Sequence, residues 1–378
     1  MNKKVKLLTV AITLVSVLSV AAISALGAAD KGSELNLNDI IELTTSNNNE
    51  LNFFKKKIQV KEKWYDEATK KDDKDSNFDE DMKEEIIPLR IEQEIKDIEW
   101  ERDQAQDKAI VESTKGYYEI MLQDQLIQLQ QKTIERMKKL LEYKKAKIDA
   151  GTESAVSLID DEANLKDAEV KLQQLKNDEE KIRMELNMKI GTPVDKKLNL
   201  KKAEIPYKIY EVKNLESVVE TMLKKYYTIT SLITKEDIDS REKAIVHTYV
   251  KDDKNELENA INPKGDYKER ENQLEDDIVE TKYKLDDEKK NIEAKIRMDY
   301  NNIINLNNDI KVKKLDCEKA ETMLKTEKTK FEAGTGTELE VKAAEEKVLS
   351  ASCEYNKAKL DYYVAVEQFK NFTKKALK

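Results

Sequence analysis

The residues of this chain best suited to chemistry are oxygen-bearing side chains in one acidic stretch. They alternate with other residues as the ligands of a twelve-residue calcium loop do: Asp73, Asp75, Asn77, Asp79, Asp81 and Glu84. Phe78, however, stands where such a loop needs glycine for its sharp turn, and Glu80 stands where an apolar residue usually sits. The stretch therefore favours a solvated acidic loop, with a weak calcium site as the alternative, and we expect no cofactor.

No other group of residues has the pattern of a catalytic centre. His247 is the one histidine, and no second His or Cys lies at the spacing of a zinc site. The sequence contains no glycine-rich phosphate loop, no His-Glu-x-x-His motif and no motif around a serine or cysteine nucleophile. We therefore predict that the protein is not an enzyme.

The composition indicates long helices. Charged residues make up 38% of the 378 residues, whereas there are only 8 Gly and 4 Pro, which is typical of coiled-coil proteins. The net charge is −9, with 68 basic and 77 acidic residues interspersed, so no dense basic surface exists to neutralise phosphates. We expect an all-α fold with narrow apolar seams, and no nucleic acid as a partner.

A short phrase occurs twice, 183 residues apart, as Ala150-Gly151-Thr152 and Ala333-Gly334-Thr335. Long charged, leucine-bearing segments flank both copies, and glycine readily takes the left-handed conformation that ends a helix. The phrase therefore predicts the tips of two antiparallel helical hairpins. Further matches on both sides of the turns extend the duplication to two tandem repeats, residues 35–200 and 213–378.

Local breakers set the limits of each hairpin. Pro88, with Pro263 as its rough counterpart, can open a helix, and no strong breaker follows Pro88 before Gly151. These roughly 60 residues would form a rod of about 90 Å. Thr152 or Thr337 can cap the returning helix. The first returning helix carries a heptad pattern that predicts a seam with a partner helix: Leu158, Leu165, Leu172, Ala168, Leu175 and Ile182.

The two cysteines are placed symmetrically about the second turn. Cys317 and Cys353 each lie 18 residues from Thr335, so a regular hairpin sets them at one height. Their counterparts in the first repeat are the apolar residues Ile134 and Val170, which suggests that both thiols face the seam. Buried free thiols and a disulfide across the hairpin are both consistent with this placement.

The amino-terminal residues 1–29 have the features of an export segment. Lys3, Lys4 and Lys6 precede an uncharged stretch that runs to Ala29 and ends in small residues suited to cleavage. At roughly 20 residues the apolar part is also long enough to span a bilayer. A cleaved signal peptide and a retained N-terminal anchor are therefore the alternatives.

Taken in this order, the chain resembles the TolC family of outer-membrane efflux proteins. The lead-ins at 37–41 and 47–51 and the pair Tyr117-Tyr118 fit phrases of that family, as does the doubled helix–turn–helix order. The resemblance implies a homotrimer whose hairpins close into an α-helical barrel. It also implies a passive efflux or secretion conduit that docks an adaptor protein and an inner-membrane transporter. The docking tips would comprise Ala150, Gly151, Thr152, Ala333, Gly334, Thr335 and Gly336.

One part of the family pattern is missing. Family members carry a membrane β-hairpin between the lead-in helix and the long helix of each half, and a spanning strand needs about 9–11 alternating residues. Here residues 70–81 and 252–268 occupy those places, and both are charged segments without an apolar band. We therefore expect a variant without the β-barrel hairpins, at the cell surface or wall.

Two other functions fit the same residues. One is an exported coiled-coil protein of the cell envelope with a structural or binding role and no channel. The other is an ion-responsive module built on the acidic stretch Asp73–Glu84. Images of a hollow trimer would favour the conduit, and the absence of heat in a calcium titration would dismiss the ion-responsive module.

Overall fold

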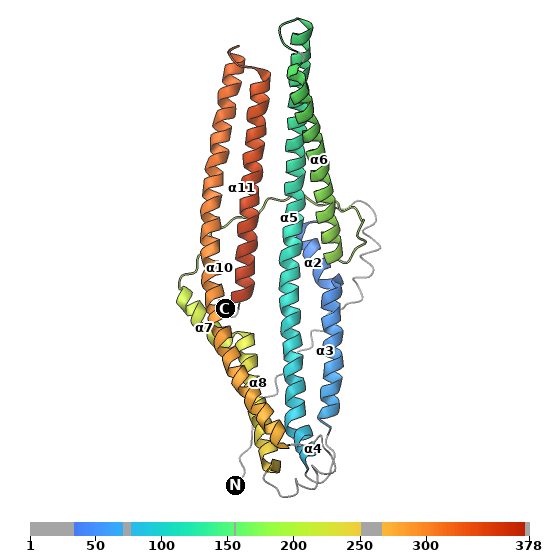
Figure 1. Cartoon of the computed structure of the whole chain (residues 1–378), viewed down its shortest axis with the longest axis vertical. Helices are drawn as coiled ribbons and strands as arrows, with labels where there is room; N and C mark the ends of the chain where they lie inside the picture. The colour runs from blue at the N-terminus through green and yellow to red at the C-terminus, as the bar shows by residue number, and fades with distance from the viewer. Residues whose placement is uncertain (1–33, 71–76, 155, 251–266, 375–378) are drawn as a thin grey trace.

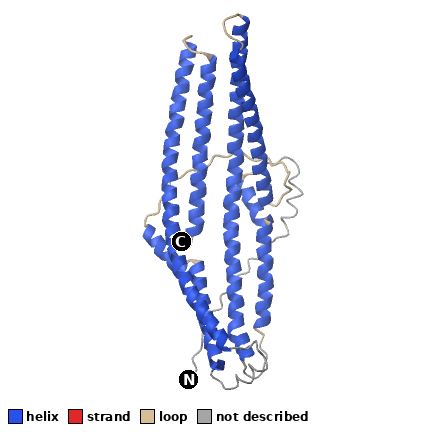
Figure 2. Cartoon of the chain, in the orientation of Figure 1, coloured by secondary structure: helices blue, strands red, loops and turns tan. Residues whose placement is uncertain are grey.

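The computed structural model describes residues 34–70, 77–154, 156–250 and 267–374. These residues form helices and connecting segments without a β-strand, as the predicted all-α fold requires (Figure 2). One isolated β-bridge pairs Leu35 with Leu200. Pro263, Asp73, Asp75 and the export segment 1–29 lie outside the described residues.

The helices of the two halves follow the same order and have similar lengths. The first half contains α2 (Leu37–Asn47), α3 (Asn49–Ala68), the short α4 (Phe78–Asp81), the π-helix η1 (Met82–Ile86), α5 (Ile87–Asp149) and α6 (Val156–Lys189). The second half contains α7 (Leu215–Lys225), α8 (Tyr227–Val250), α10 (Tyr267–Glu332) and α11 (Glu338–Thr373). The long helices α5 and α10 have 63 and 66 residues, and the returning helices α6 and α11 have 34 and 36. The predicted architecture of repeated antiparallel hairpins is therefore confirmed.

The molecule is a long rod in which α5 and α10 run almost from end to end (Figure 1). The returning helices α6 and α11 lie beside them toward one end, and α3 and α8 lie beside them toward the other. Contacts between α10 and α11, α11 and α5, and α5 and α6 make a row of four helices at the tip end. Both hairpin tips consequently lie at the same end of the molecule.

The predicted uninterrupted rod is the helix α5. Pro88 lies in its first turn, directly after the π-helical turn η1, where the regular i to i−4 hydrogen bonds are already interrupted. The 63 residues give a length of about 95 Å at 1.5 Å per residue. The heptad residues of α6 are buried or half-buried, which fits a seam against α5.

The two halves are joined by a crossover segment, residues 195–214, that passes over the middle of the rod (Figure 1). At its start, Leu35 N–H donates to the Asn199 carbonyl at 2.8 Å, and Lys201 N–H donates to the Leu35 carbonyl at 2.9 Å. Farther along, the Tyr362 hydroxyl accepts from Tyr210 N–H at 2.8 Å. Two apolar clusters flank this level, one against α5 and α6 and the other against α10 and α11. The core of the molecule therefore lies at its middle.

No helix among the described ranges has the length and apolar character needed to cross a membrane.

Candidate docking site at the hairpin tips

The first tip ends α5 with a glycine-dependent turn. Gly151 has φ +73°, and its N–H donates to the Ile148 carbonyl at 2.8 Å. Thr152 N–H donates to the Lys147 carbonyl at 2.9 Å, which completes a Schellman cap. A Cβ atom built on Gly151 would meet nothing within 4 Å, so glycine is needed for its backbone conformation and not for space.

The second tip repeats this geometry. Gly334 has φ +74°, its N–H donates to the Phe331 carbonyl at 2.9 Å, and Thr335 N–H donates to the Lys330 carbonyl at 2.9 Å. Gly336 adds a close approach, because a Cβ there would lie 3.0 Å from the Lys330 Cβ. The repeated phrase thus folds into two turns with matching hydrogen bonds.

The two threonines proposed as helix caps have different roles. Thr337 caps α11 as predicted, because its hydroxyl accepts from Glu340 N–H at 3.3 Å and Glu340 accepts from Thr337 N–H at 2.7 Å. Thr152 instead closes the preceding helix, since its hydroxyl donates to the Lys147 carbonyl at 2.9 Å. The alternative in which Thr152 caps the returning helix is therefore wrong.

A groove of about 660 Å³ lies where the first tip meets the start of α11. Ala150 and Thr152 line it, as expected for tip residues, but the second hairpin contributes residues 337–339 instead of its glycine turn. Leu140 and Tyr143 of α5 supply apolar and aromatic surface that the turn motif did not indicate. Their spacing of three residues on a helix is the signal in the sequence that places both on one face.

Three solved structures share this arrangement of helices. The outer-membrane channel OprN superposes with a TM-score of 0.66 at 11% identity, covering 89% of each chain. The outer-membrane channel CmeC of Campylobacter jejuni gives 0.66 at 12% identity over 90% of this chain and 86% of its own. The outer-membrane protein VceC of Vibrio cholerae gives 0.62 at 12% identity over 89% and 95%. No protein-family model and no curated protein sequence matches the chain.

The chain has a TolC-like fold. The match covers 89% of this chain, so it extends over most of the helices of both halves. At 11–12% identity the match supports the fold that the family resemblance implied, and the fold alone.

In this TolC-like fold the two hairpins meet near their tips through ion pairs between α5 and α11. Lys139 lies 2.8 Å from Glu338, and Lys342 lies 2.9 Å from Glu135. The hydrogen bond from Lys139 lowers the pKa of Glu338, and that from Lys342 lowers the pKa of Glu135. Lower on the same interface, Arg136 lies 2.8 Å from Glu346. Ion pairs therefore join the two hairpins at this end.

The cysteines of the second TolC-like hairpin are free thiols in the structure, Cys353 buried and Cys317 partly exposed. Burial raises the pKa of Cys353 to about 11. Ile134, the counterpart of Cys317, is buried, but Val170, the counterpart of Cys353, is exposed. The two halves therefore do not match side chain for side chain at this level, and the cross-hairpin disulfide stays a prediction.

The acidic stretch is partly described. Asn77 accepts from Glu80 N–H at 3.1 Å and caps α4, Asp79 lies within α4, and Glu84 lies in η1. Asp81 accepts a hydrogen bond from the Tyr249 hydroxyl at 2.6 Å. The helix α4 thus begins at Phe78, the sixth position of the suggested calcium loop. Among the described residues, no group of three or more His, Cys, Asp or Glu side chains is placed to hold a metal.

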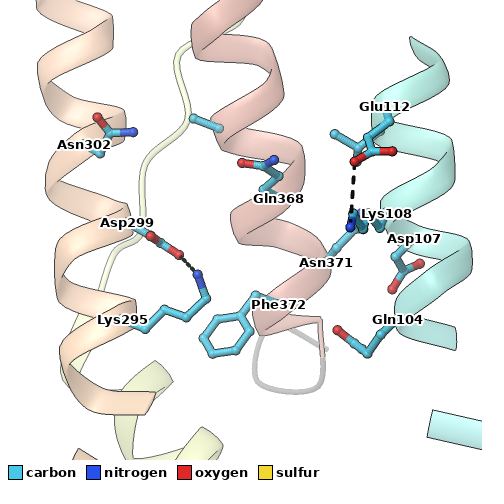
Figure 3. Close-up of a pocket in the computed structure, with 12 residues that line it drawn as sticks. Gln104, Asp107, Lys108, Glu112, Lys295, Asp299, Asn302, Gln368, Asn371 and Phe372 are labelled. Carbon is cyan, nitrogen blue, oxygen red and sulfur yellow. Dashed lines mark hydrogen bonds and ion pairs between the residues drawn. The ribbon is translucent and has the colours of Figure 1, made fainter. Parts of the chain in front are cut away.

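A polar cavity of about 380 Å³ lies between α5, α10 and the end of α11 (Figure 3). Its charged groups are paired, with Lys295 2.7 Å from Asp299 and Lys108 4.0 Å from Glu112. This lining can form hydrogen bonds with a polar solute but has no nucleophile beside a base. The remaining polar lining consists of Asp107, which pairs with Lys374, and of four side-chain amides: Gln104, Asn302, Gln368 and Asn371.

Proposed function

We propose that this chain is a subunit of a TolC-like conduit for efflux or secretion, exported to the cell envelope and working passively with an adaptor protein and an inner-membrane transporter. The conduit would be a homotrimer built from the repeats 35–200 and 213–378. The observation that carries the proposal is the pair of hairpins with matching tips at one end of a row of helices, in the same fold as solved outer-membrane channels.

The outer helix α10 supports an assembly, because it has two apolar faces. Ile296, Ile303 and Ile310 recur every seven residues and are buried within the chain. Met298 and Leu315 lie on roughly the opposite side of the helix and are 65% and 64% exposed. A highly charged chain that exposes a line of large apolar side chains along an edge helix is suited to contact with another helix.

The other edge of the row, α6, also exposes apolar side chains, among them Ile159 and Met188. Because α6 and α10 are different helices, contact between the α6 edge of one copy and the α10 edge of the next is heterologous, and such contacts generate rings when the rotation closes. We propose three copies, the number that the TolC resemblance implies.

The tip groove supports adaptor docking. It combines the exposed ring of Tyr143 with Leu140 and Leu339, and Lys144 and Lys147 also line it. Apolar and aromatic side chains together with charged ones are the composition expected for the site of a protein partner. The residues that line the groove belong to the tip end of the rod, which a partner approaching along the long axis would meet first (Figure 1).

The oligomer is tested with the purified chain lacking residues 1–29, by light scattering and single-particle imaging. We expect a hollow trimeric rod. The variants Met298→Glu and Leu315→Glu should dissociate it, because each places a charge in the apolar contact. Ile209→Glu, which changes an exposed apolar residue of the crossover segment, is the matched control and should leave the trimer intact. If the unaltered chain is a monomer or a dimer, the proposal of a trimeric conduit is wrong.

Export is tested in cells that lack the gene, by following accumulation of ethidium after complementation. Leu339→Glu, in the tip groove, should restore export poorly while leaving the trimer intact. Ile209→Glu should restore it fully. If a trimer forms but neither the wild-type chain nor any variant changes accumulation of ethidium or other exported solutes, the alternative of an envelope coiled-coil protein without a channel is favoured.

A further inference from the structure

At the end opposite the tips, the two halves meet through buried charges. Arg90, in the second turn of α5, lies 2.8 Å from Asp239 of α8 and also donates to Glu242 of the same helix. Arg270 of α10 donates to the other oxygen of Glu242 at 2.6 Å. Asp239 and Glu242 are each 2% exposed. Two arginines from different halves thus neutralise two carboxylates inside the chain.

The same interface continues along α5 as a network of hydrogen bonds. Asp97 accepts from the Tyr227 hydroxyl at 2.8 Å and from the Ser231 hydroxyl at 2.9 Å. Gln93 also donates to Asp97, at 3.0 Å. Trp100 stacks on the Tyr227 ring with centroids 5.6 Å apart. From Arg90 to Trp100, one face of α5 is therefore held to α8 by oriented polar and aromatic contacts.

Burial makes this contact sensitive to the loss of one partner. Among the described residues, the second carboxylate oxygen of Asp239 has no hydrogen-bond partner, and Arg90 is the cation paired with this carboxylate. Removing one partner of a buried pair leaves an uncompensated charge in a poorly solvated site, which is strongly destabilising. At the tip end, by contrast, Glu338 and Glu135 are 45% and 61% exposed, and pairs of that kind contribute little.

We propose that Arg90, Asp239, Glu242 and Arg270 form a charge clamp that fixes the first half of the chain to the second at the end opposite the tips. The clamp holds α8 and α10 against α5, so relative motion of the two hairpins is confined to the tip end, where exposed ion pairs join them. The clamp acts within one chain and does not depend on the proposed conduit.

The clamp is tested by hydrogen exchange with mass spectrometry on the purified chain. Arg90→Met should raise exchange at least tenfold in α8 and in residues 87–100, with less than a twofold change at the hairpin tips. Arg102→Met is the control, because Arg102 also lies on α5 but pairs with its neighbour Asp103. This variant should show the same hydrogen exchange as the wild type. Unchanged exchange in α8 of Arg90→Met, or an equal rise at the tips, would overturn the proposal.

Arg90→Lys is the second variant, because it keeps the positive charge but loses the fork that reaches two carboxylates. It should raise hydrogen exchange in α8 and in residues 87–100 by a smaller factor than Arg90→Met does. Exchange equal to that of the wild type in these segments would also contradict the clamp. Sodium chloride at about 1 M, where the screening length falls to about 3 Å, separates the two ends. It should raise exchange at the tips, whereas a larger rise in α8 than at the tips would contradict burial of the clamp.

Discussion

Tyr117 and Tyr300 hold the two ends of the same connecting segment from opposite halves of the chain. The Tyr117 hydroxyl, on α5, donates to the Lys201 carbonyl, and the Tyr300 hydroxyl, on α10, accepts from Val212 N–H at 3.1 Å. The two tyrosines are counterparts in the proposed sequence duplication. Each half of the chain therefore fastens the connecting segment through one tyrosine hydroxyl.

This relationship predicts the effect of removing either hydroxyl. Tyr117→Phe and Tyr300→Phe should each lower the free energy of unfolding by about 1 kcal/mol, because each loses one hydrogen bond to backbone. Tyr283→Phe is the control, since its ring is exposed on α10 and should change the unfolding free energy little. Urea unfolding followed by circular dichroism measures all three. Equal stabilities for Tyr117→Phe and Tyr283→Phe would contradict the role given to the hydroxyl.

Replacing glycine by alanine should lower the stability at the tip turns and raise it inside a helix. Gly151→Ala and Gly334→Ala place a Cβ at φ above +70°, which should cost about 1 kcal/mol and increase local hydrogen exchange at the tips. Gly116→Ala lies inside α5, where a Cβ would meet Leu186 at an ordinary 3.8 Å. It should stabilise the helix by about 0.5–1 kcal/mol. Faster exchange near residue 116 would contradict this reading.

The ion pairs near the tips predict that the contact between the two hairpins weakens in acid. The pKa values of Glu135 and Glu338 are lowered from 4.5 by hydrogen bonds from lysines, so both contribute stability above pH 4.5. That contribution is lost as the pH falls through the lowered values. Hydrogen exchange at the start of α11 should therefore increase below pH 4.5, after correction for the intrinsic rate. Glu338→Gln should show the faster exchange already at pH 7 and a weaker pH dependence.

The buried thiol of Cys353 should react slowly with alkylating reagents near neutral pH. Because the thiolate is the reactive form and burial raises the pKa of Cys353 to about 11, alkylation of Cys353 by iodoacetamide at pH 8 should be at least tenfold slower than that of a free model thiol. Cys317 has a raised pKa but is partly exposed, so it should react faster than Cys353. Mass mapping without reductant tests the disulfide, and a linked peptide pair would show that the two thiols combine.

The sequence by itself determined the elements whose causes are local. Pro88 and Gly151 delimit α5 because ring geometry and the left-handed conformation act within one or two turns. The repeated phrase therefore predicted both tips and the all-α hairpins. The heptad of α6 predicted a seam with its neighbour, because a helical period depends on spacing alone. The TolC-like fold was the expectation that the resemblance of this order of elements to the TolC family implied.

The tertiary structure decided what depends on residues far apart in the chain. Arg90 and Asp239 are 149 positions apart, and the buried pair that they form leaves no local pattern in the sequence. Thr152 and Thr337 have equal capping propensity, and hydrogen bonds in each turn decided which of them caps a helix. The tip groove likewise required the start of α11 to lie beside α5. Burial and pairing of charges are properties of the packed chain, so a pattern of residues predicts a helix but not the partner of each of its faces.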